Sequence, residues 1–305
     1  FKEVKNQQDQ EHDIDEMCEW SRSWLLKYHP GKCKHLRFGS HENPDIIDYY
    51  INGSKIEQST EEKDLGVIID ENLKFNSHIS QKVNQANKIM GLIRRCFTYM
   101  DETIFTRLFK ALVRPHLEYA NIVWHPSTYK DKILIENVQR RATKQISCCA
   151  GLEYEDRLKK LNLPCLAYRK LRGDVIEVYK MCNNYYDEEI SPPLSQVKDI
   201  HNRQTRGGQH NLVKTKYKTK IRSMAFRNRV VNFWNELPNK VKESKTLVTF
   251  ENRLDRFWSA YNIKFNFDRC IDFEKQRIDP NYAGSVTRDN NLLIDLDING
   301  DIDLD

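Results

Sequence analysis

The stretch "STEEKDLGVIIDENLKFNSHI", Ser59 to Ile79, contains the change from strand to helix that decides the fold. A short apolar run, Leu65–Ile69, lies between the charged pairs Lys63-Asp64 and Asp70-Glu71, which is the pattern of a short strand. Glycine is unusual inside a strand, where it often marks a bulge or the close approach of another backbone. Gly66 therefore predicts either a β-bulge or a place where a ligand comes near the strand.

The residues before this stretch predict one helix followed by short strands. Apolar residues recur at intervals of three and four between residues 9 and 28, which is the period of a helix. Pro30 and Gly31 end that helix, and Cys33–Phe38 alternates between apolar and polar residues. Asn52-Gly53 between two β-prone runs indicates a hairpin. We expect residues 1–75 to form a domain of one helix and short antiparallel strands.

The residues after this stretch predict a mostly α fold. Apolar positions follow the helical period from His78 onward, and this pattern indicates a helical bundle over residues 76–190. Residues 191–222 begin with "SPP" and have no periodicity, so they predict a basic linker. A second helical region, a pair of helices, is expected over residues 223–268. Residues 269–305 are expected to be an acidic, disordered tail, whose charge would shield the basic linker.

The cysteines and the apolar content favour a reduced, intracellular protein. Eight cysteines are scattered without a CxxC motif, which argues against a disulfide framework and against a zinc site. We expect no signal peptide, and no apolar run approaches the roughly 18 residues of a membrane span. We expect a nuclear or cytoplasmic ribonucleoprotein with no membrane partner. The sequence begins with Phe1 rather than Met, so we expect a fragment.

Two clusters of cations predict contact with nucleic acid. Residues 200–235 carry nine Lys and Arg and no Asp or Glu, and a basic block of this kind suggests a polyanion partner. A second cluster lies on the helix expected near residues 130–146. A solvated basic helix face, or a basic linker without a ligand, fits each pattern as well. The candidate residues are Arg140, Arg141, Lys144, Lys214, Lys216, Tyr217, Lys218, Lys220 and Arg222, with Tyr217 as a stacking ring and Arg140 and Lys144 on one helix side.

The tryptophans and two histidines are interpreted as structural. All five tryptophans fall on or near apolar stripes, so we expect them in the core. His116 and His125 have no nearby nucleophile or cysteine pair, which favours structural roles over catalytic ones. The tryptophans are Trp20, Trp24, Trp124, Trp234 and Trp258.

Seven blocks in order over residues 13–260 carry a family resemblance. Together they resemble the C-terminal part of reverse transcriptases from jockey-type non-LTR retrotransposons. The resemblance implies the end of a palm in residues 1–75, a thumb-like bundle in residues 76–190 and a C-terminal region beyond. The blocks are "MCEWSRSWLLKYHPGKCKHLRFG" (17–39), "EKDLGVIIDENLKFNSHI" (62–79), "LVRPHLEYANIVWHP" (112–126), "ENVQRRATKQI" (136–146), "YEDRLKKLNL" (154–163), "RGDVIEVYKM" (172–181) and "RVVNFWNELPNKV" (229–241).

The resemblance implies roles for four residues of the palm region. Lys32 in "HPGKC" would lie near the incoming nucleotide. Leu65 and Gly66, with Lys63 beside them, would form the primer grip that approaches the 3′ end of the primer. A residue without a Cβ suits this role, because it lets the backbone come close to a sugar-phosphate.

The chemistry of polymerisation is expected outside this chain. Nucleotide joining needs carboxylates that hold two Mg²⁺ about 3.5–4 Å apart. The family places them upstream, and no two aspartates are adjacent here. Asp64 is interpreted as a residue that supports the turn, and Asp70 as the residue that ends the strand. We therefore expect no catalytic residue, no metal site and no cofactor in this chain, and Mg²⁺ only in the full-length polymerase.

The expected partners follow from the same resemblance. They are a template–primer of RNA and DNA, and the missing palm and fingers portion of the same polyprotein. The chain alone is predicted to be inactive. Two alternatives stay open: a non-catalytic nucleic-acid-binding protein derived from such an element, and a helical interaction protein.

Overall fold

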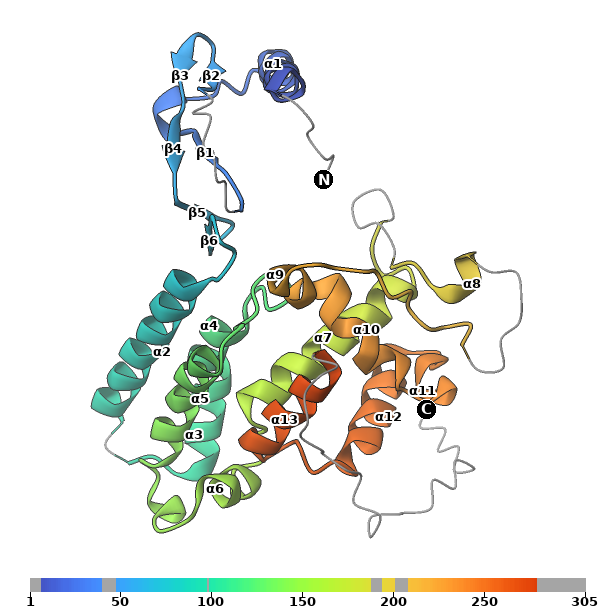
Figure 1. Cartoon of the computed structure of the whole chain (residues 1–305). Coiled ribbons are helices and arrows are strands. Elements are labelled where there is room, and N and C mark those ends of the chain that lie inside the picture. Colours follow the sequence, from blue (N-terminus) through green and yellow to red (C-terminus); the bar gives the residue numbers. More distant parts are fainter. Residues whose placement is uncertain (1–6, 40–47, 98, 188–193, 201–207, 279–305) are drawn as a thin grey trace. The chain divides into compact units, whose positions relative to one another are not determined.

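The computed structural model describes residues 7–39, 48–97, 99–187, 194–200 and 208–278 (Figure 1). The chain forms two compact units, residues 1–78 and 79–305. The strands belong to the first unit, and the second is built from helices. The predicted fold class, mostly α with a small antiparallel hairpin region near the N-terminus, is confirmed. Within the described residues, no helix has both the length and the apolar character needed to cross a membrane.

The first unit combines one long helix with three pairs of short strands. The hairpin β2–β3 turns at Asn52-Gly53, where both residues have positive φ, as predicted. β5 and β6 form a second antiparallel pair, and β1 pairs with β4 in parallel, which the sequence did not predict. A small core of Cys18, Ile51 and Ile56 joins the helix to the strands. The elements are α1 (Gln7–Ser23), η1 (Pro30–Lys32), β1 (Lys34–Leu36), β2 (Tyr50–Ile51), β3 (Ser54–Lys55), β4 (Glu57–Ser59), β5 (Glu61–Asp64) and β6 (Val67–Asp70).

Leu65 and Gly66 form the tight turn between β5 and β6. Asp64 pairs with Val67, so two residues connect the strands, and their φ angles are 42° and 85°. The predicted strand therefore does not include Leu65, and Gly66 lies in the turn rather than at a β-bulge, which was one of the two alternatives for it. Two-residue hairpin turns of type I′ need positive φ at both positions, and their backbone twist matches that of the strands. Gly66 meets this need without strain, whereas Leu65 meets it at a cost and leaves its side chain 84% exposed.

Substitutions at this turn should change the stability of the hairpin in opposite directions. Gly66→Ala is expected to cost about 1–2 kcal/mol, because a Cβ is disfavoured at positive φ. Leu65→Asn is expected to stabilise the turn, because asparagine tolerates this conformation. Amide hydrogen exchange at Ile69, which pairs with Glu62 across the hairpin, measures both effects. If Gly66→Ala leaves this exchange unchanged, the turn does not have the conformation described.

Asp70 ends the last strand and directs the chain into the first helix of the bundle. Its carboxylate accepts hydrogen bonds from the backbone N–H groups of Asn72 (3.1 Å), Lys74 (3.1 Å) and Phe75 (2.6 Å). The side chain of His78 is buried, and its Nδ1 accepts a hydrogen bond from Ile68 N–H at 3.2 Å. The stretch that opened the sequence analysis is thus a hairpin, an aspartate turn and a helix start.

The second unit is a helical bundle with α7 at its centre. Helices α5, α10, α12 and α13 all pack on α7 (Figure 1). Side chains of Asp101, Thr128, Thr219 and Thr246 cap α3, α5, α9 and α12. The elements are α2 (Asn76–Cys96), α3 (Glu102–Leu108), η2 (Phe109–Val113), α4 (Arg114–Glu118), α5 (Tyr129–Thr143), η3 (Ser147–Cys149), α6 (Tyr154–Lys160), α7 (Leu166–Cys182), α8 (Val197–Ile200), α9 (Lys220–Met224), α10 (Phe226–Asn235), α11 (Asn239–Lys242), α12 (Leu247–Ser259) and α13 (Phe267–Ile278).

The predicted separation between the bundle and a C-terminal helical pair is not seen. Aromatic rings join the two ranges: Tyr179 on α7 stacks on Phe250 at 4.3 Å, and Tyr168 meets Trp258 edge-on at 5.8 Å. Burial of such rings contributes strongly to a core, so α10 and α12 belong to the same unit as α7. Trp124, Trp234 and Trp258 are buried as predicted, but Trp20 and Trp24 are exposed, so the core prediction is wrong for those two.

Two further boundaries differ from the sequence predictions. The described part of the predicted linker has structure: Gln196 bridges to Leu212, and Leu194 and Leu212 are buried. The predicted tail begins within α13, whose buried residues include Ile271 and Phe273, so regular structure does not end at Asp268. Charged residues between these apolar positions hid the helical period. The remaining tail residues, 279–305, lie outside the described residues, and so does the start of the predicted linker, residues 191–193.

Candidate nucleic-acid interface

Five exposed cations of the second unit lie in one segment, residues 214–222, called here the basic segment. Tyr217 in the middle of it is 42% exposed. The segment is anchored through uncharged groups: Thr215 Oγ1 donates to Asn228 Oδ1 at 2.5 Å, and Asn228 Nδ2 donates to the Arg222 carbonyl at 2.6 Å. The charged ends are left in solvent, and within the described residues none of them pairs with a carboxylate. They belong to Lys214, Lys216, Lys218, Lys220 and Arg222.

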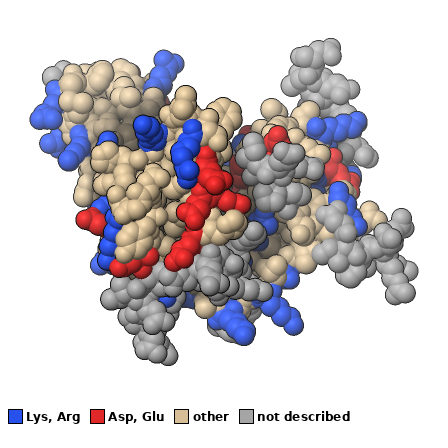
Figure 2. Space-filling view, turned by 90° about the horizontal axis from the view of Figure 1, so that it is seen from above, with Lys and Arg blue, Asp and Glu red and all other residues tan. Residues whose placement is uncertain are grey.

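Several cations of the second unit are paired with carboxylates, whereas the basic segment carries five unpaired ones within nine residues. Arg172 binds Asp255 and Glu251, Lys132 binds Glu274, and Arg277 binds Glu236. On the face seen in Figure 2, Lys and Arg side chains gather in several groups, with Asp and Glu side chains among them. Surface charge alone therefore does not mark one interface. A run of unpaired cations does, because each of them can bind phosphate without first losing a protein partner.

The second predicted cluster, on α5, is divided by the fold. The Arg140 guanidinium lies over the ring of Tyr154 at 4.7 Å and is half-buried. Arg141 is exposed and donates to Asn87 Oδ1 at 3.3 Å, and Lys144 is exposed at the end of α5. Arg140 and Lys144 therefore do not present their charges together. Phosphate contacts of the three residues stay a prediction, and Arg140 would have to leave its ring to make one.

The predicted palm residues all lie in the first unit. Lys63 on β5 is exposed, and it lies on the same hairpin as the exposed turn of Leu65 and Gly66. Lys32 is exposed at the end of η1, a separate element. The structure thus brings three of the four residues together on one hairpin. Their roles toward primer and nucleotide stay predictions.

The carboxylates of this hairpin do not fit a pair of catalytic metal ions. Asp70 uses its carboxylate on three backbone N–H groups. Asp64 pairs with Val67 beside the turn, whereas Asp70 pairs with Glu61 at the other end of the hairpin. Within the described residues, no group of three or more His, Cys, Asp and Glu side chains is arranged to hold a metal ion.

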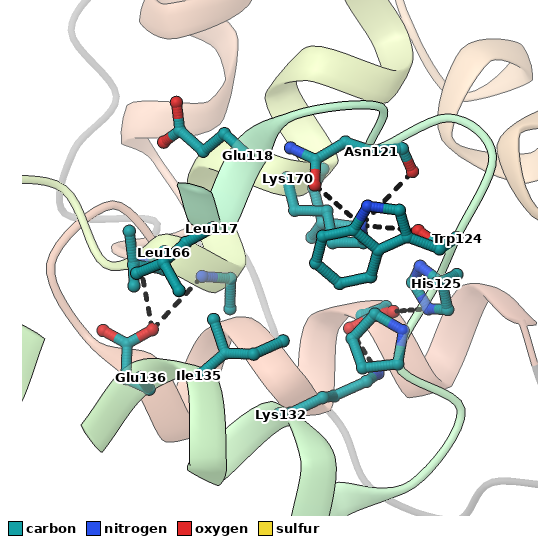
Figure 3. A pocket seen from close by; sticks show the side chains of 14 residues that line it. Leu117, Glu118, Asn121, Trp124, His125, Lys132, Ile135, Glu136, Leu166 and Lys170 are labelled. Carbon is teal, nitrogen blue, oxygen red and sulfur yellow. Dashed lines mark hydrogen bonds and ion pairs between the residues drawn. The ribbon is translucent and has the colours of Figure 1, made fainter. Parts of the chain in front are cut away.

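A buried polar network, which sequence reasoning missed, holds the loop between α4 and α5. Lys170 Nζ donates to the carbonyls of Asn121 (3.2 Å) and Trp124 (2.9 Å) and lies 4.1 Å from the centre of the Trp124 ring (Figure 3). Burial lowers the pKa of Lys170 to about 7, and Asp174 opposes this shift. The adjoining cavity of about 30 Å³ has room for a water or two and for no substrate.

A buried carboxylate, that of Glu274, extends this network. Glu274 on α13 lies 2.7 Å from Lys132 Nζ and 2.9 Å from His125 Nε2 (Figure 3). Burial acts to raise the pKa of Glu274, but Lys132 and His125 hold it well below its usual range. Burial lowers the pKa of His125 to about 4, so this histidine is neutral near pH 7. The buried position of His125 is consistent with the structural role predicted for it.

Glu136 connects α5 to the start of α7. Its carboxylate accepts hydrogen bonds from Leu166 N–H (2.9 Å), Ala167 N–H (3.3 Å) and the Tyr154 hydroxyl (2.5 Å). Burial raises its pKa to about 7, although these donors oppose the shift. Charged residues on the apolar faces of helices were the one sequence signal for these buried groups.

Two curated proteins match part of this chain. The RNA-directed DNA polymerase from the mobile element jockey of Drosophila funebris is 29% identical over 143 residues. The chain is related to a retrotransposon protein. The match covers 44% of this chain and 15% of the polymerase, so the chain spans a small part of that protein. An uncharacterized protein of Caenorhabditis elegans is 24% identical over 140 residues, 45% of this chain and 69% of that protein. No family model and no solved structure matches the chain.

Proposed function

We propose that this chain is the C-terminal fragment of a retrotransposon reverse transcriptase and that it holds template–primer without joining nucleotides. The observation that carries the proposal is the match to the jockey polymerase. The exposed basic segment without carboxylate partners supports the binding role. The upstream palm and fingers would supply the adjacent aspartates and Mg²⁺, so the purified chain should not extend a primer.

The hairpin turn supports a role at the primer. An exposed leucine at φ 42° costs energy that an asparagine would not, and strain of this kind tends to persist where it serves function. We assign to Leu65, Gly66 and Lys63 the contact with the primer 3′ end. Lys32 is assigned a place near the incoming nucleotide in the assembled polymerase.

The binding role predicts a steep dependence on salt. If the five cations of the basic segment each contact a phosphate, the slope of log affinity against log salt should be about −3.5 to −4.5. Replacing all five by glutamine should reduce the magnitude of this slope by about 3.5 to 4.5. Fluorescence anisotropy with a labelled RNA–DNA heteroduplex measures the slope for each variant.

A matched control separates the basic segment from general positive charge. Five exposed cations elsewhere on the second unit are replaced by glutamine in the control variant, which should keep most of the slope. A flat response of the unmodified chain would contradict the proposal and favour a helical interaction protein. The control residues are Lys88, Arg95, Lys240, Lys245 and Arg256.

One observation favours a second function, a non-catalytic nucleic-acid-binding protein derived from such an element. The match covers 69% of the C. elegans protein, so this region makes up most of a much shorter protein. An experiment in which the upstream polymerase portion is added as a separate protein distinguishes the two functions. A polymerase fragment should increase primer extension by that portion, whereas an independent binding protein should leave it unchanged.

A further inference from the structure

A groove of about 660 Å³ opens beside the basic segment. Its walls are the start of α5, the basic segment with α9, and the face of α13 that includes Ile271 and Lys275. The volume falls within the roughly 300–1,000 Å³ typical of ligand sites. We propose that this groove binds a single nucleic-acid strand, with one base stacked on Tyr217 and the adjoining phosphates on Lys218 and Lys220. This inference rests on the proposed function and specifies the class of ligand that the groove binds.

The charge of the groove is positive where a phosphate would lie. Four lysines and one carboxylate, Glu274, line it. Glu274 is buried against Lys132 and His125, so its charge is compensated inside the protein. Lys275 lies 3.6 Å from Asp272 and is partly compensated as well. Lys218 and Lys220 are exposed and have no carboxylate partner within the described residues, so they are the cations available for phosphate.

The two tyrosines of the groove differ in what already covers their rings. Tyr129 lies against Phe267 at 6.3 Å, carries Lys275 over its ring at 5.4 Å and donates from its hydroxyl to Asp268 at 3.2 Å. Tyr217 is 42% exposed and makes no ring contact or side-chain hydrogen bond within the described residues. Tyr217 is therefore the ring available for stacking.

An aromatic ring without a stacking partner, next to exposed cations, favours unpaired bases over bases within a duplex. A base within a duplex is stacked on its neighbours and has no face left for a protein ring, whereas an unpaired base can stack on one. Lys218 and Lys220, which follow Tyr217 along the groove, can hold the phosphates that adjoin that base. The site would therefore take the single-stranded part of a template rather than its paired part.

The test compares Tyr217→Ala with Tyr217→Phe in the full chain. Tyr217→Ala should weaken binding of a ten-nucleotide oligo(U) or oligo(dT) by about 5- to 150-fold, and Tyr217→Phe should bind within about twofold of the unmodified chain. Both variants should bind an RNA–DNA heteroduplex normally. An oligonucleotide with abasic sites should bind the alanine variant and the unmodified chain equally, since it has no base to stack. The RNA and DNA strands compared in parallel show which of the two the groove prefers.

A charge variant tests the phosphate contacts of the same site. Lys218→Gln with Lys220→Gln should reduce the salt slope for the single strand by about 1.4, which is two phosphate contacts. If Tyr217→Ala binds single strands like the unmodified chain while the five-cation variant has lost duplex binding, the groove inference is overturned and the proposed function stands. If the unmodified chain binds neither strand nor duplex, the proposed function fails and the inference fails with it.

Discussion

Replacement of Asp174 by alanine is expected to lower the free energy of unfolding by about 3–5 kcal/mol. Asp174 on α7 accepts two hydrogen bonds from Arg229 on α10, at 2.9 Å from Nε and 3.0 Å from Nη2, and both side chains are buried. Removal of the carboxylate leaves a buried guanidinium that cannot lose its proton. Because Arg229 also donates to the carbonyl of Asn121 at 3.2 Å, the loss should extend to the loop between α4 and α5.

Urea-induced unfolding followed by tryptophan fluorescence measures this effect. Arg256→Ala on the same bundle removes an exposed arginine and should change the free energy of unfolding by less than about 0.5 kcal/mol. The double replacement Asp174→Leu and Arg229→Met should recover most of the loss, since apolar residues of similar volume remove both charges together. An Asp174→Ala variant as stable as Arg256→Ala would show that this pair does not hold the bundle.

The parts of the fold that depend on local pattern could be predicted from the sequence. Asn52-Gly53 specifies a tight turn through its own backbone preferences, and the structure has that turn. The caps and the helical periods of α2, α5, α7, α10 and α12 also depend on residues within a few positions of one another. These features need no knowledge of what the helix packs against.

The parts that depend on distant partners could not be predicted. Asp174 and Arg229 are 55 residues apart, and each alone has the pattern of a surface charge. The period of α13 is visible only when Glu274 and Arg277 are counted as buried, and that depends on Lys132 and Glu236. Because leucine is rare at positive φ, the sequence pattern predicts a strand residue at Leu65. The turn at this position is set by the register of β5 and β6 rather than by the backbone preference of leucine.

The features of the candidate interface could likewise be predicted only where they depend on residues close together in the sequence. The basic segment was predictable, because it lies within residues 200–235, where nine cations have no carboxylate nearby in sequence to neutralise them. The groove beside it was not, since its walls come from segments far apart along the chain. Arg140 shows the opposite error: its place beside Arg141 suggested a shared surface, but Tyr154 provides a ring that draws it inward.

Trp124→Ala is the second substitution with a large expected effect, a loss of about 3–5 kcal/mol in the free energy of unfolding. The indole is buried, and its N–H donates to the Tyr119 carbonyl at 2.7 Å. Its ring lies 4.1 Å from the ammonium group of Lys170, whose charge is buried and depends on such neighbours. Truncation therefore removes apolar burial, a hydrogen bond and the ring beneath a buried cation at once.

A graded series separates these contributions. Trp124→Phe keeps a ring next to Lys170 but leaves the Tyr119 carbonyl without its donor, so it should cost about 1–3 kcal/mol. Tyr99→Ala is the matched control, because Tyr99 is an aromatic residue of the same unit that is 77% exposed and should cost less than about 0.5 kcal/mol. Urea unfolding measured by circular dichroism avoids the loss of the tryptophan signal. Equal costs for Trp124→Ala and Trp124→Phe would mean that the ring beneath Lys170 contributes nothing, and the loop would then depend on the hydrogen bonds of Lys170 and Arg229 alone.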